Sequence, residues 1–472
     1  MSETATSNHD RTAKEGDAQV KNANRSTTPG STFFRDYISQ GWEARQDEPT
    51  PRSEVAPYAK TRRDAISALH HGERLVIAAG DTKVRSNDDD YAYRAHSAFA
   101  HLTGWGSATV PGSLLVFEPT ADGHDVTLFF RKAAGRDTDE FYANPSIGEF
   151  WTGPRPSLEQ VSAHLDIATR DLGEFSATRG DVSESDPQLA QELSELRLVK
   201  DEWEVQQLRD AVAATSNGFD EILRALPRAT EHPRGERVVE GAFTARARLE
   251  GNDLGYSTIA AAGPHACYLH WSTNDGPVLP GDLILVDAGV EVDSYYTADV
   301  TRTMPIDGAF TPVQRRVYEA VLKAADDAFA IVKPGITFRE VHETALASIA
   351  KSLDAWGEIL PMSLDEALKP EHQPHRRYMV HGTSHHLGLD VHDCAQARRE
   401  MYLDGILEPG NVFTIEPGLY FHPGDLTVPE ELRGIGVRIE DDIVVTETGA
   451  ENLSAGIPRS ANDVEAWLAA HR

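Results

Sequence analysis

Cysteine is scarce in this chain, with only Cys267 and Cys394 among 472 residues. Two cysteines cannot build a disulfide framework, so we expect two free thiols in a reducing compartment, and therefore a cytoplasmic protein. Long apolar runs are also missing, because no window approaches the roughly 18 unbroken apolar residues of a membrane-spanning helix. The first residues have neither a basic start nor an apolar stretch, so no secretory signal is expected there.

The chain has fewer positive than negative side chains. It contains 45 Lys and Arg residues and 75 Asp and Glu residues, which gives a formal net charge of −30. Binding to nucleic acid or to an anionic membrane depends on clustered Lys and Arg, so neither is expected as a partner. The acidic surplus indicates a well-solvated surface. The hydrophobic fraction of 40% is typical of globular proteins, and the length suffices for two domains.

Composition divides the chain into a tail and two domains. Residues 1–30 hold hardly any large apolar side chain, which predicts a disordered tail. Residues 31–195 contain apolar runs between Gly, Pro and Asp turns, which predicts an N-terminal mixed α/β domain. Apolar positions near helical spacing from Leu196 to Leu226 predict a helix that opens a C-terminal domain, residues 196–472. The predicted N-terminal strands include Leu75–Ala79, Ser113–Phe117 and Val126–Phe130.

The C-terminal domain contains an internal repeat. VLPGDLILVDAG (residues 278–289) and LEPGNVFTIEPG (407–418) both place a Pro-Gly turn before an apolar strand that ends on a carboxylate, seven residues after the proline. An ionised carboxylate at the inner end of a buried strand is costly unless it is paired or binds a metal. The repeat therefore marks Asp287 and Glu416 as candidate ligands, and it predicts two related half-domains with a metal centre between them.

Two further acidic segments accompany the repeat. A strand, a turn and a returning strand after Asp287 would bring Asp299 beside it, so that one acid bridges two ions and the other chelates one. Taken alone, the pair is as readily explained as two solvated hairpin acids. In GIGVRIEDDIVV, strand alternation places Arg438 and Glu440 on one face. A plain ion pair between these two is the alternative to a metal ligand.

Histidine is concentrated in HGTSHHLGLDVHD, residues 381–393. We expect at least one of these histidines to bind metal and the others to contact substrate or transfer protons. Carboxylates with one imidazole suit Mn(II), Co(II) or Fe(II) better than a sulfur-rich structural zinc site does. Two ions about 3.5–4 Å apart can share a bridging hydroxide as nucleophile, which predicts metal-assisted hydrolysis. A zincin motif is absent, because His342-Glu343 is followed by Leu346 where histidine is needed, and there is no Gly-x-Ser-x-Gly elbow.

In this order the elements resemble the pita-bread metallopeptidases, and HGTSHHLGLDVHD resembles their Xaa-Pro aminopeptidase (aminopeptidase P) branch. The resemblance covers about residues 196–460. It implies an α/β (α+β) protein, in which a mixed α/β domain precedes a C-terminal pita-bread domain with a pseudo-twofold repeat. It also implies two divalent ions, with Mn(II) preferred and Co(II), Fe(II) or Zn(II) as alternatives. The implied metal ligands are Asp287, Asp299, His385, Glu416 and Glu440.

The same resemblance implies roles around the ions. Glu416 would also be the general base, while His270, His381 and His392 match histidines that contact substrate or handle protons. Arg438 matches an arginine that orients its acidic neighbours. The implied activity is hydrolysis of the N-terminal Xaa-Pro bond of peptides by a metal-bridging hydroxide, in a homo-oligomer, either a dimer or a tetramer.

The N-terminal domain resembles the family's N-terminal module more loosely, through RSNDDDYAYR (85–94) and LTGW (102–105). By this match Asp88 would reach the site of its own or a neighbouring subunit. One departure concerns spacing, because Asp299 lies twelve positions after Asp287 where the family spacing is eleven. One extra residue would turn the second acid to the opposite face, so we expect the turn around Val292–Tyr295 to absorb it.

The proline preference rests on the resemblance. An X-Pro amide lacks an N–H, so its site must offer an apolar pocket for the ring, with His381, Leu387 and His392 as candidate walls. Prolidase, which shares the ligands but cleaves only Xaa-Pro dipeptides, is the nearest alternative. A non-catalytic pita-bread binding protein and a metal-free creatinase-like hydrolase are further alternatives, disfavoured because all five ligands are present.

Overall fold

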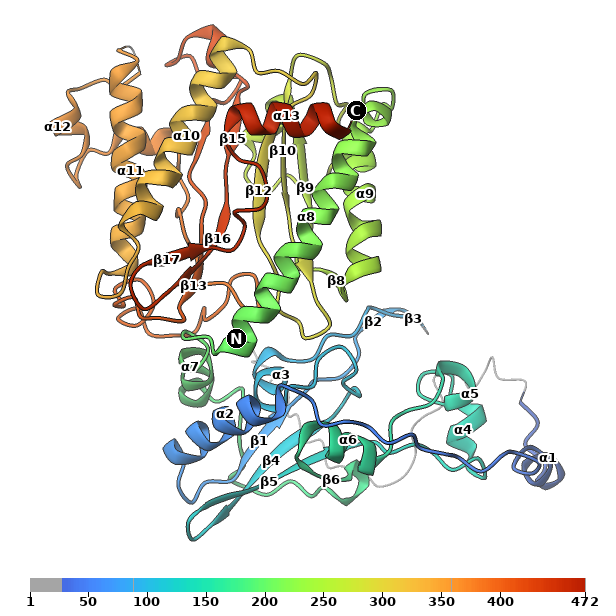
Figure 1. Cartoon of the computed structure of the whole chain (residues 1–472). Helices are drawn as coiled ribbons and strands as arrows, with labels where there is room; N and C mark the ends of the chain where they lie inside the picture. Colours follow the sequence, from blue (N-terminus) through green and yellow to red (C-terminus); the bar gives the residue numbers. More distant parts are fainter. Residues whose placement is uncertain (1–27, 88, 358, 472) are drawn as a thin grey trace, which may run out of the picture.

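The structure is a computed structural model that describes residues 28–87, 89–357 and 359–471. Nearly all of the predicted tail lies outside these residues, and so does Asp88. Figure 1 shows two lobes, one built from the elements up to α7 and the other from α8 onward. None of the helices in the described ranges is long and apolar enough to cross a membrane.

The N-terminal domain is built on a five-stranded mixed sheet in the order β6-β5-β4-β1-β7. β4 pairs antiparallel with β1 and β5, whereas β6 and β7 join their neighbours in parallel. The three predicted strands are confirmed as β1, β4 and β5. The strands are β1 (Leu75–Ala78), β2 (Val84–Ser86), β3 (Asp89–Asp90), β4 (Leu114–Thr120), β5 (Gly123–Phe130), β6 (Ala168–Asp171) and β7 (Val182–Ser183). The helices are α1 (Thr32–Ile38), α2 (Ala56–Leu69), α3 (Ser97–Thr103), α4 (Asp139–Ala143), α5 (Glu149–Thr152), α6 (Leu158–Leu165) and α7 (Pro187–Glu195).

The C-terminal domain consists of two helix pairs with antiparallel sheets (Figure 1). α8 packs on α9 with the sheet β12-β10-β9, and α10 packs on α11 with the sheet β13-β16-β17. The helices are α8 (Glu202–Thr230), α9 (Gly235–Glu250), α10 (Pro312–Ile331), α11 (Phe338–Ala355), α12 (Leu364–Ala367) and α13 (Ala461–His471). The strands are β8 (Asp253–Leu254), β9 (Ile259–Ala262), β10 (Leu283–Ala288), β11 (Val290–Glu291), β12 (Val300–Pro305), β13 (Val412–Ile415), β14 (Gly418–Tyr420), β15 (Gly436–Arg438), β16 (Asp441–Val445) and β17 (Ala450–Asn452).

The predicted repeat is confirmed in the backbone. Gly281 and Gly410 both adopt the left-handed region, with φ of 91° and 93°, which explains why each half has glycine after the proline of its turn. β10 and β13 begin two residues after these glycines. Asp287 then lies near the end of β10, and Glu416 directly follows β13. The two halves therefore present their acids at equivalent positions.

The predicted helix at the start of the C-terminal domain begins later than expected, at Glu202. Asp201 caps it, because its side chain accepts from the Glu204 N–H while the Glu204 carboxylate accepts from the Asp201 N–H. The preceding residues instead join the second half, since the Lys200 N–H donates to the Gly410 carbonyl at 2.8 Å. This N-cap sets the start of the helix at Glu202, whereas periodicity alone would begin it at Leu196.

A buried ion cluster lies where this segment meets the histidine-rich loop. Asp393 is 1% exposed, and its carboxylate accepts from Arg197 Nε at 2.9 Å and from Lys200 Nζ at 3.2 Å. The adjacent Cys394 thiol is free and buried, as is Cys267, so the prediction of two free thiols is confirmed. Because all three charges are buried, the Asp393 carboxylate is stabilised by the two cations, and each cation is stabilised by the carboxylate.

We expect Asp393→Asn to lower the free energy of unfolding by about 3–5 kcal/mol, because two buried cations lose their counter-charge. Burial alone would raise the pKa of Asp393, but the charges of Lys200 and Arg197 lower it to about 2. This value lies below the ~3.9 of an unfolded aspartate, so the stabilisation is complete above about pH 4 and is lost as the pH falls through 2. Urea unfolding at pH 7 and pH 3 measures both effects, with the exposed Asp404→Asn as control. Equal unfolding free energies for Asp393→Asn and the wild type at pH 7 would contradict the prediction.

Candidate metal centre

The nine residues predicted as metal ligands or as catalytic groups all lie around one cavity of about 350 Å³ between the two halves of the C-terminal domain. The cavity also has walls that the sequence did not indicate, namely Leu269, Gly382, Ser384 and Tyr402. The predicted residues that it brings together are His270, Asp287, Asp299, His381, His385, His392, Glu416, Arg438 and Glu440.

The two acids of the first half converge, as predicted. The Tyr256 hydroxyl lies 2.6 Å from Asp287 Oδ1 and 2.5 Å from Asp299 Oδ1. The twelve-residue spacing therefore does not turn Asp299 away. The connection contains Tyr295 in the left-handed region, with φ of 72°, within the turn where the sequence predicted that the extra residue is absorbed.

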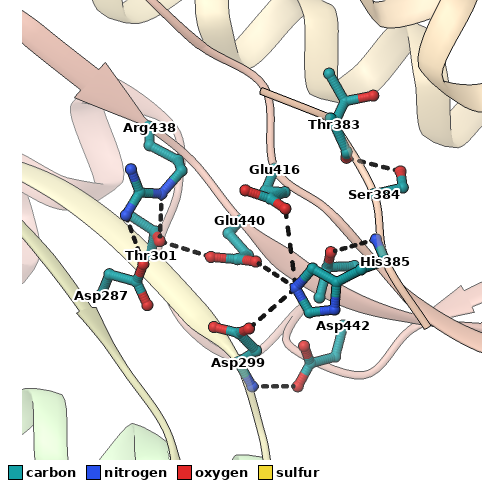
Figure 2. A network of polar contacts seen from close by, with 12 residues as sticks. Asp287, Asp299, Thr301, Thr383, Ser384, His385, Glu416, Arg438, Glu440 and Asp442 are labelled. Atoms are coloured by element: carbon teal, nitrogen blue, oxygen red, sulfur yellow. Dashed lines mark hydrogen bonds and ion pairs between the residues drawn. The ribbon is translucent and has the colours of Figure 1, made fainter. Parts of the chain in front are cut away.

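In the second half, the histidine-rich loop runs beside β13. The Glu416 N–H donates to the Thr383 carbonyl, and the Thr414 N–H donates to the His385 carbonyl, each at 2.9 Å. This pairing turns the His385 ring toward the acids (Figure 2). His385 Nε2 lies 3.2 Å from Asp299 Oδ2, 3.8 Å from Glu416 Oε1 and 3.9 Å from Glu440 Oε1.

Arg438 and Glu440 do not form the direct ion pair that was the alternative to a metal ligand. Arg438 Nη2 binds Asp287 Oδ2 at 2.5 Å, and its Nε donates to the Thr301 hydroxyl at 3.1 Å. Thr301 in turn donates to Glu440 Oε2 at 2.6 Å, as Figure 2 shows. Arg438 therefore orients Asp287 directly and Glu440 through Thr301, which leaves Glu440 Oε1 directed at the other acids.

The electrostatics of the cluster favour added positive charge. Burial raises the pKa of Glu416 to about 7, against the lowering effect of His385 and Arg438. Burial and the Asp287 charge raise the pKa of Asp299, and burial and the Asp299 charge raise that of Glu440 well above its usual range. Burial disfavours the His385 imidazolium, yet Asp299 raises its pKa to about 9.

These carboxylates repel one another because they are buried at close range. Donor atoms of Asp299, His385 and Glu440 all lie within 4.8 Å of one another. The Tyr256 phenol has one proton, so it can donate to only one of the two acids that it contacts. Divalent cations would relieve this repulsion, and an oxygen-rich set with one imidazole has the chemistry that such ions bind. The donor set therefore fits the predicted ions.

The remaining histidines surround the acids. His381 Nε2 lies 2.9 Å from the Tyr420 hydroxyl, and its Nδ1 lies 3.5 Å from Glu416 Oε2. Burial and the Arg438 charge lower the pKa of His381 to about 3, so its ring is neutral. The His392 ring lies 4.3 Å from the His385 ring, centroid to centroid. His270 reaches the cavity from the segment after β9.

His386, which directly follows the proposed ligand His385, is not among the residues that line the cavity. It is 2% exposed and packs against Phe338 and Tyr402, with ring centroids 4.6 Å away in each case. Leu387 was wrongly predicted as a wall of the proline pocket. Its side chain is instead fully buried in a hydrophobic core cluster with Tyr295 and other residues of both domains.

Sequence reasoning missed Tyr256, Thr301 and Tyr420. Tyr256 contacts acids 31 and 43 residues away, and Thr301 contacts Arg438 across 137 residues. Tyr420 accepts from Arg438 Nη1 at 3.1 Å and can donate to His381. A single hydroxyl carries no periodic signal, so only the packing of the strands reveals these contacts.

Comparison with known proteins gives a consistent result. The profile of metallopeptidase family M24 matches residues 206–447, and that of the aminopeptidase P N-terminal domain matches residues 58–188. Xaa-Pro aminopeptidase 2 of Streptomyces coelicolor is 49% identical over 452 residues, which cover 91% of this chain and 94% of that protein. The Xaa-Pro aminopeptidase of Escherichia coli is 32% identical over 448 residues, with 88% and 98% covered.

The fold can be compared with solved structures. An Escherichia coli aminopeptidase P variant in complex with substrate matches with a TM-score of 0.75 at 28% identity, over 90% of this chain and 100% of that chain. Zinc-substituted Escherichia coli aminopeptidase P in complex with product matches with a TM-score of 0.74 at 29% identity, over 89% and 99%. The predicted fold class, a mixed α/β domain followed by a pita-bread domain, is thereby confirmed.

Proposed function

Because the chain belongs to metallopeptidase family M24, we propose that it is an aminopeptidase that uses divalent metal ions to hydrolyse the N-terminal Xaa-Pro bond of peptides. The observation that carries the proposal is the convergence of four carboxylates and one imidazole on one cavity of about 350 Å³, with Asp287, Asp299 and Glu440 buried and Glu416 partly buried. An uncompensated cluster of this kind is costly, and bound cations would compensate its charge.

We propose that two ions, preferably Mn(II), occupy the cluster. Bound there, they would polarise the carbonyl of the scissile peptide bond and activate a water molecule for attack. The preference for Mn(II) is supported by the oxygen-rich donor set, with Co(II), Fe(II) and Zn(II) as alternatives. The proposed ligands are Asp287, Asp299, His385, Glu416 and Glu440.

Glu416 is the proposed general base. Its raised pKa of about 7 suits a group that accepts a proton near neutral pH and then passes it to the proline nitrogen as the bond breaks. The neutral ring of His381, beside Glu416, can hydrogen-bond the substrate without adding charge. His270 and His392 line the same cavity and are proposed to contact the peptide. Arg438 orients the acids through Asp287 and Thr301.

Leu269 and Tyr402 are the proposed apolar walls for the proline ring. Both line the cavity together with His381 and His392. A proline in second position offers no amide N–H, so a site for it can dispense with an acceptor there and bury the ring instead.

The assignment is tested by incubating the purified protein with Mn(II) and an Xaa-Pro-Yaa tripeptide, with Xaa-Ala-Yaa as control. We expect release of the first residue from the proline peptide, and little from the alanine peptide. Cleavage confined to Xaa-Pro dipeptides would instead identify a prolidase. Fewer than one metal ion per chain after supplementation, with no cleavage, would identify a non-catalytic binding protein.

Three further proposals concern the protein as a whole. Two buried free thiols support a cytoplasmic location. Exposed aromatic side chains on α1 and α5, such as Phe33 (79%) and Trp151 (57%), support assembly with a second copy, as a dimer or tetramer. Light scattering on the purified protein measures that assembly.

We place the domain boundaries at 31–195 and 196–472, which limited proteolysis would test.

A further inference from the structure

The connection between Asp287 and Asp299 extends out of the C-terminal domain and contacts the N-terminal domain. The Ser107 N–H donates to the Asp293 carbonyl at 2.8 Å. A Cβ atom on Gly106 would come within 2.1 Å of the same carbonyl oxygen, so the backbones approach more closely than any side chain allows. The Ala95 N–H also donates to the Tyr295 hydroxyl, at 3.3 Å. The tip of this connection is therefore seated on the N-terminal domain.

Arg94 of the N-terminal domain binds two different segments of the C-terminal domain. Its Nε donates to Glu291 Oε2 at 2.6 Å, and its Nη2 donates to the Leu389 carbonyl at 2.5 Å. The guanidinium also stacks over the Tyr295 ring, with Cζ 4.8 Å from the ring centroid. One planar cation thus contacts both the connection and the histidine-rich loop, a geometry that a guanidinium allows and a single ammonium does not.

Both segments lead directly to proposed metal ligands. Glu291 forms a bridge with Thr297, which precedes Asp299 by two residues. Leu389 lies between His385 and His392 in the histidine-rich loop. The two segments also touch each other, because the Thr297 N–H donates to the Gly388 carbonyl at 3.1 Å. Arg94 therefore connects the backbone that carries Asp299 with the backbone that carries His385.

The ion pair between Arg94 and Glu291 matters energetically because the Glu291 carboxylate is buried. The Arg94 side chain is 34% exposed, and an exposed ion pair alone contributes little to stability. The Glu291 side chain, however, is only 5% exposed, and its other hydrogen bond comes from the uncharged Asn252 side chain. Without Arg94, this buried carboxylate loses the cation that it contacts, so the connection must shift to reach water.

We propose that Arg94 is a positioning residue through which the N-terminal domain keeps the two ligand-bearing segments of the metal centre in register. The proposal rests on the proposed function, because it assumes that metal binds at Asp299 and His385. The proposal gives the YAYR segment, residues 91–94, a role at the metal centre that needs no contact with substrate.

The experiment compares Arg94→Met, Arg94→Lys and Gly106→Ala with the wild-type protein, in the full chain. Mn(II) affinity is measured by calorimetry without peptide, and the visible absorption of the Co(II)-loaded protein reports the ligand geometry. Arg74→Met is the matched control, since Arg74 binds Glu118 and Asp181 within the N-terminal domain.

We expect Arg94→Met to weaken Mn(II) binding by roughly tenfold, as loss of a residue that orients a ligand does, and to change the Co(II) spectrum. Arg94→Lys should recover part of the affinity through Glu291, Gly106→Ala should resemble Arg94→Met, and Arg74→Met should bind as the wild type does.

Wild-type affinity and an unchanged Co(II) spectrum in Arg94→Met would overturn the inference, even with a lowered melting temperature, because a merely structural ion pair affects stability alone. A wild-type protein that binds no Mn(II) would instead contradict the proposed function, so the two failures are distinguishable. If Arg94→Met does not fold, Arg94→Lys and Gly106→Ala carry the same test.

Discussion

Glu416→Gln is expected to lower kcat for an Xaa-Pro-Yaa peptide by roughly 10³–10⁴-fold, the upper range for loss of a general base. The glutamine amide keeps the size of the side chain but cannot accept the proton that the attacking water must lose. Steady-state kinetics at saturating Mn(II) measure the effect, since added metal compensates for weaker binding by a residue that is also a proposed ligand.

The matched control is Glu408→Gln, because Glu408 is exposed and belongs to the same repeat segment as Glu416. We expect its kcat to equal that of the wild type. A Glu416→Gln protein that retained kcat within tenfold of the wild type would show that another group takes the proton, and His381 would then be the first residue to test.

Asp299→Asn is expected to have two opposite effects, one on metal binding and one on stability. Mn(II) binding should weaken by more than the roughly 10–100-fold that loss of an orienting residue costs, because a ligand itself is removed. The metal-free protein should become more stable, on the order of 1 kcal/mol, because the cluster loses one of its mutually repelling charges.

The direction of the stability effect follows from the pKa of Asp299. Burial and the Asp287 charge raise it, so the ionised form destabilises the metal-free fold at pH 7, and this cost disappears as the pH falls and the carboxyl is protonated. The gain of Asp299→Asn should therefore be largest near pH 7 and shrink toward pH 4, in thermal unfolding with a chelator present. Asp293→Asn, in the same connection but exposed, is the control. A metal-free variant less stable than the wild type at pH 7 would contradict the prediction.

Part of the proposed ligand set could be predicted from the sequence alone, because some of its signals are local. A Pro-Gly turn, an apolar strand and a terminal acid recur in both halves, which marks Asp287 and Glu416 without knowledge of the fold. Four histidines within a short segment mark the loop that carries His385. Strand alternation correctly placed Arg438 and Glu440 on the side of the site, while Val437 and Ile439 pack in the core.

Tertiary structure decided which atoms meet. The sequence left open whether Arg438 pairs with Glu440, and packing shows that it binds Asp287 and reaches Glu440 only through Thr301. Leu387 was wrongly placed in the site, because its burial depends on a core cluster that joins both domains. Periodicity predicts which side of an element is apolar, but it does not identify the distant element that will cover it.

The sequence by itself thus determined the donor chemistry, the duplicated halves and the family resemblance, since each depends on residues close together in the chain. Only the tertiary structure decided that Tyr256 joins the two acids of the first half and that Arg94 connects the N-terminal domain to both ligand-bearing segments. The physical reason is the distance along the chain between the residues that interact. Residue type and spacing specify strands and turns, whereas the contact between Arg94 and Leu389 spans 295 residues and exists only once two domains have packed.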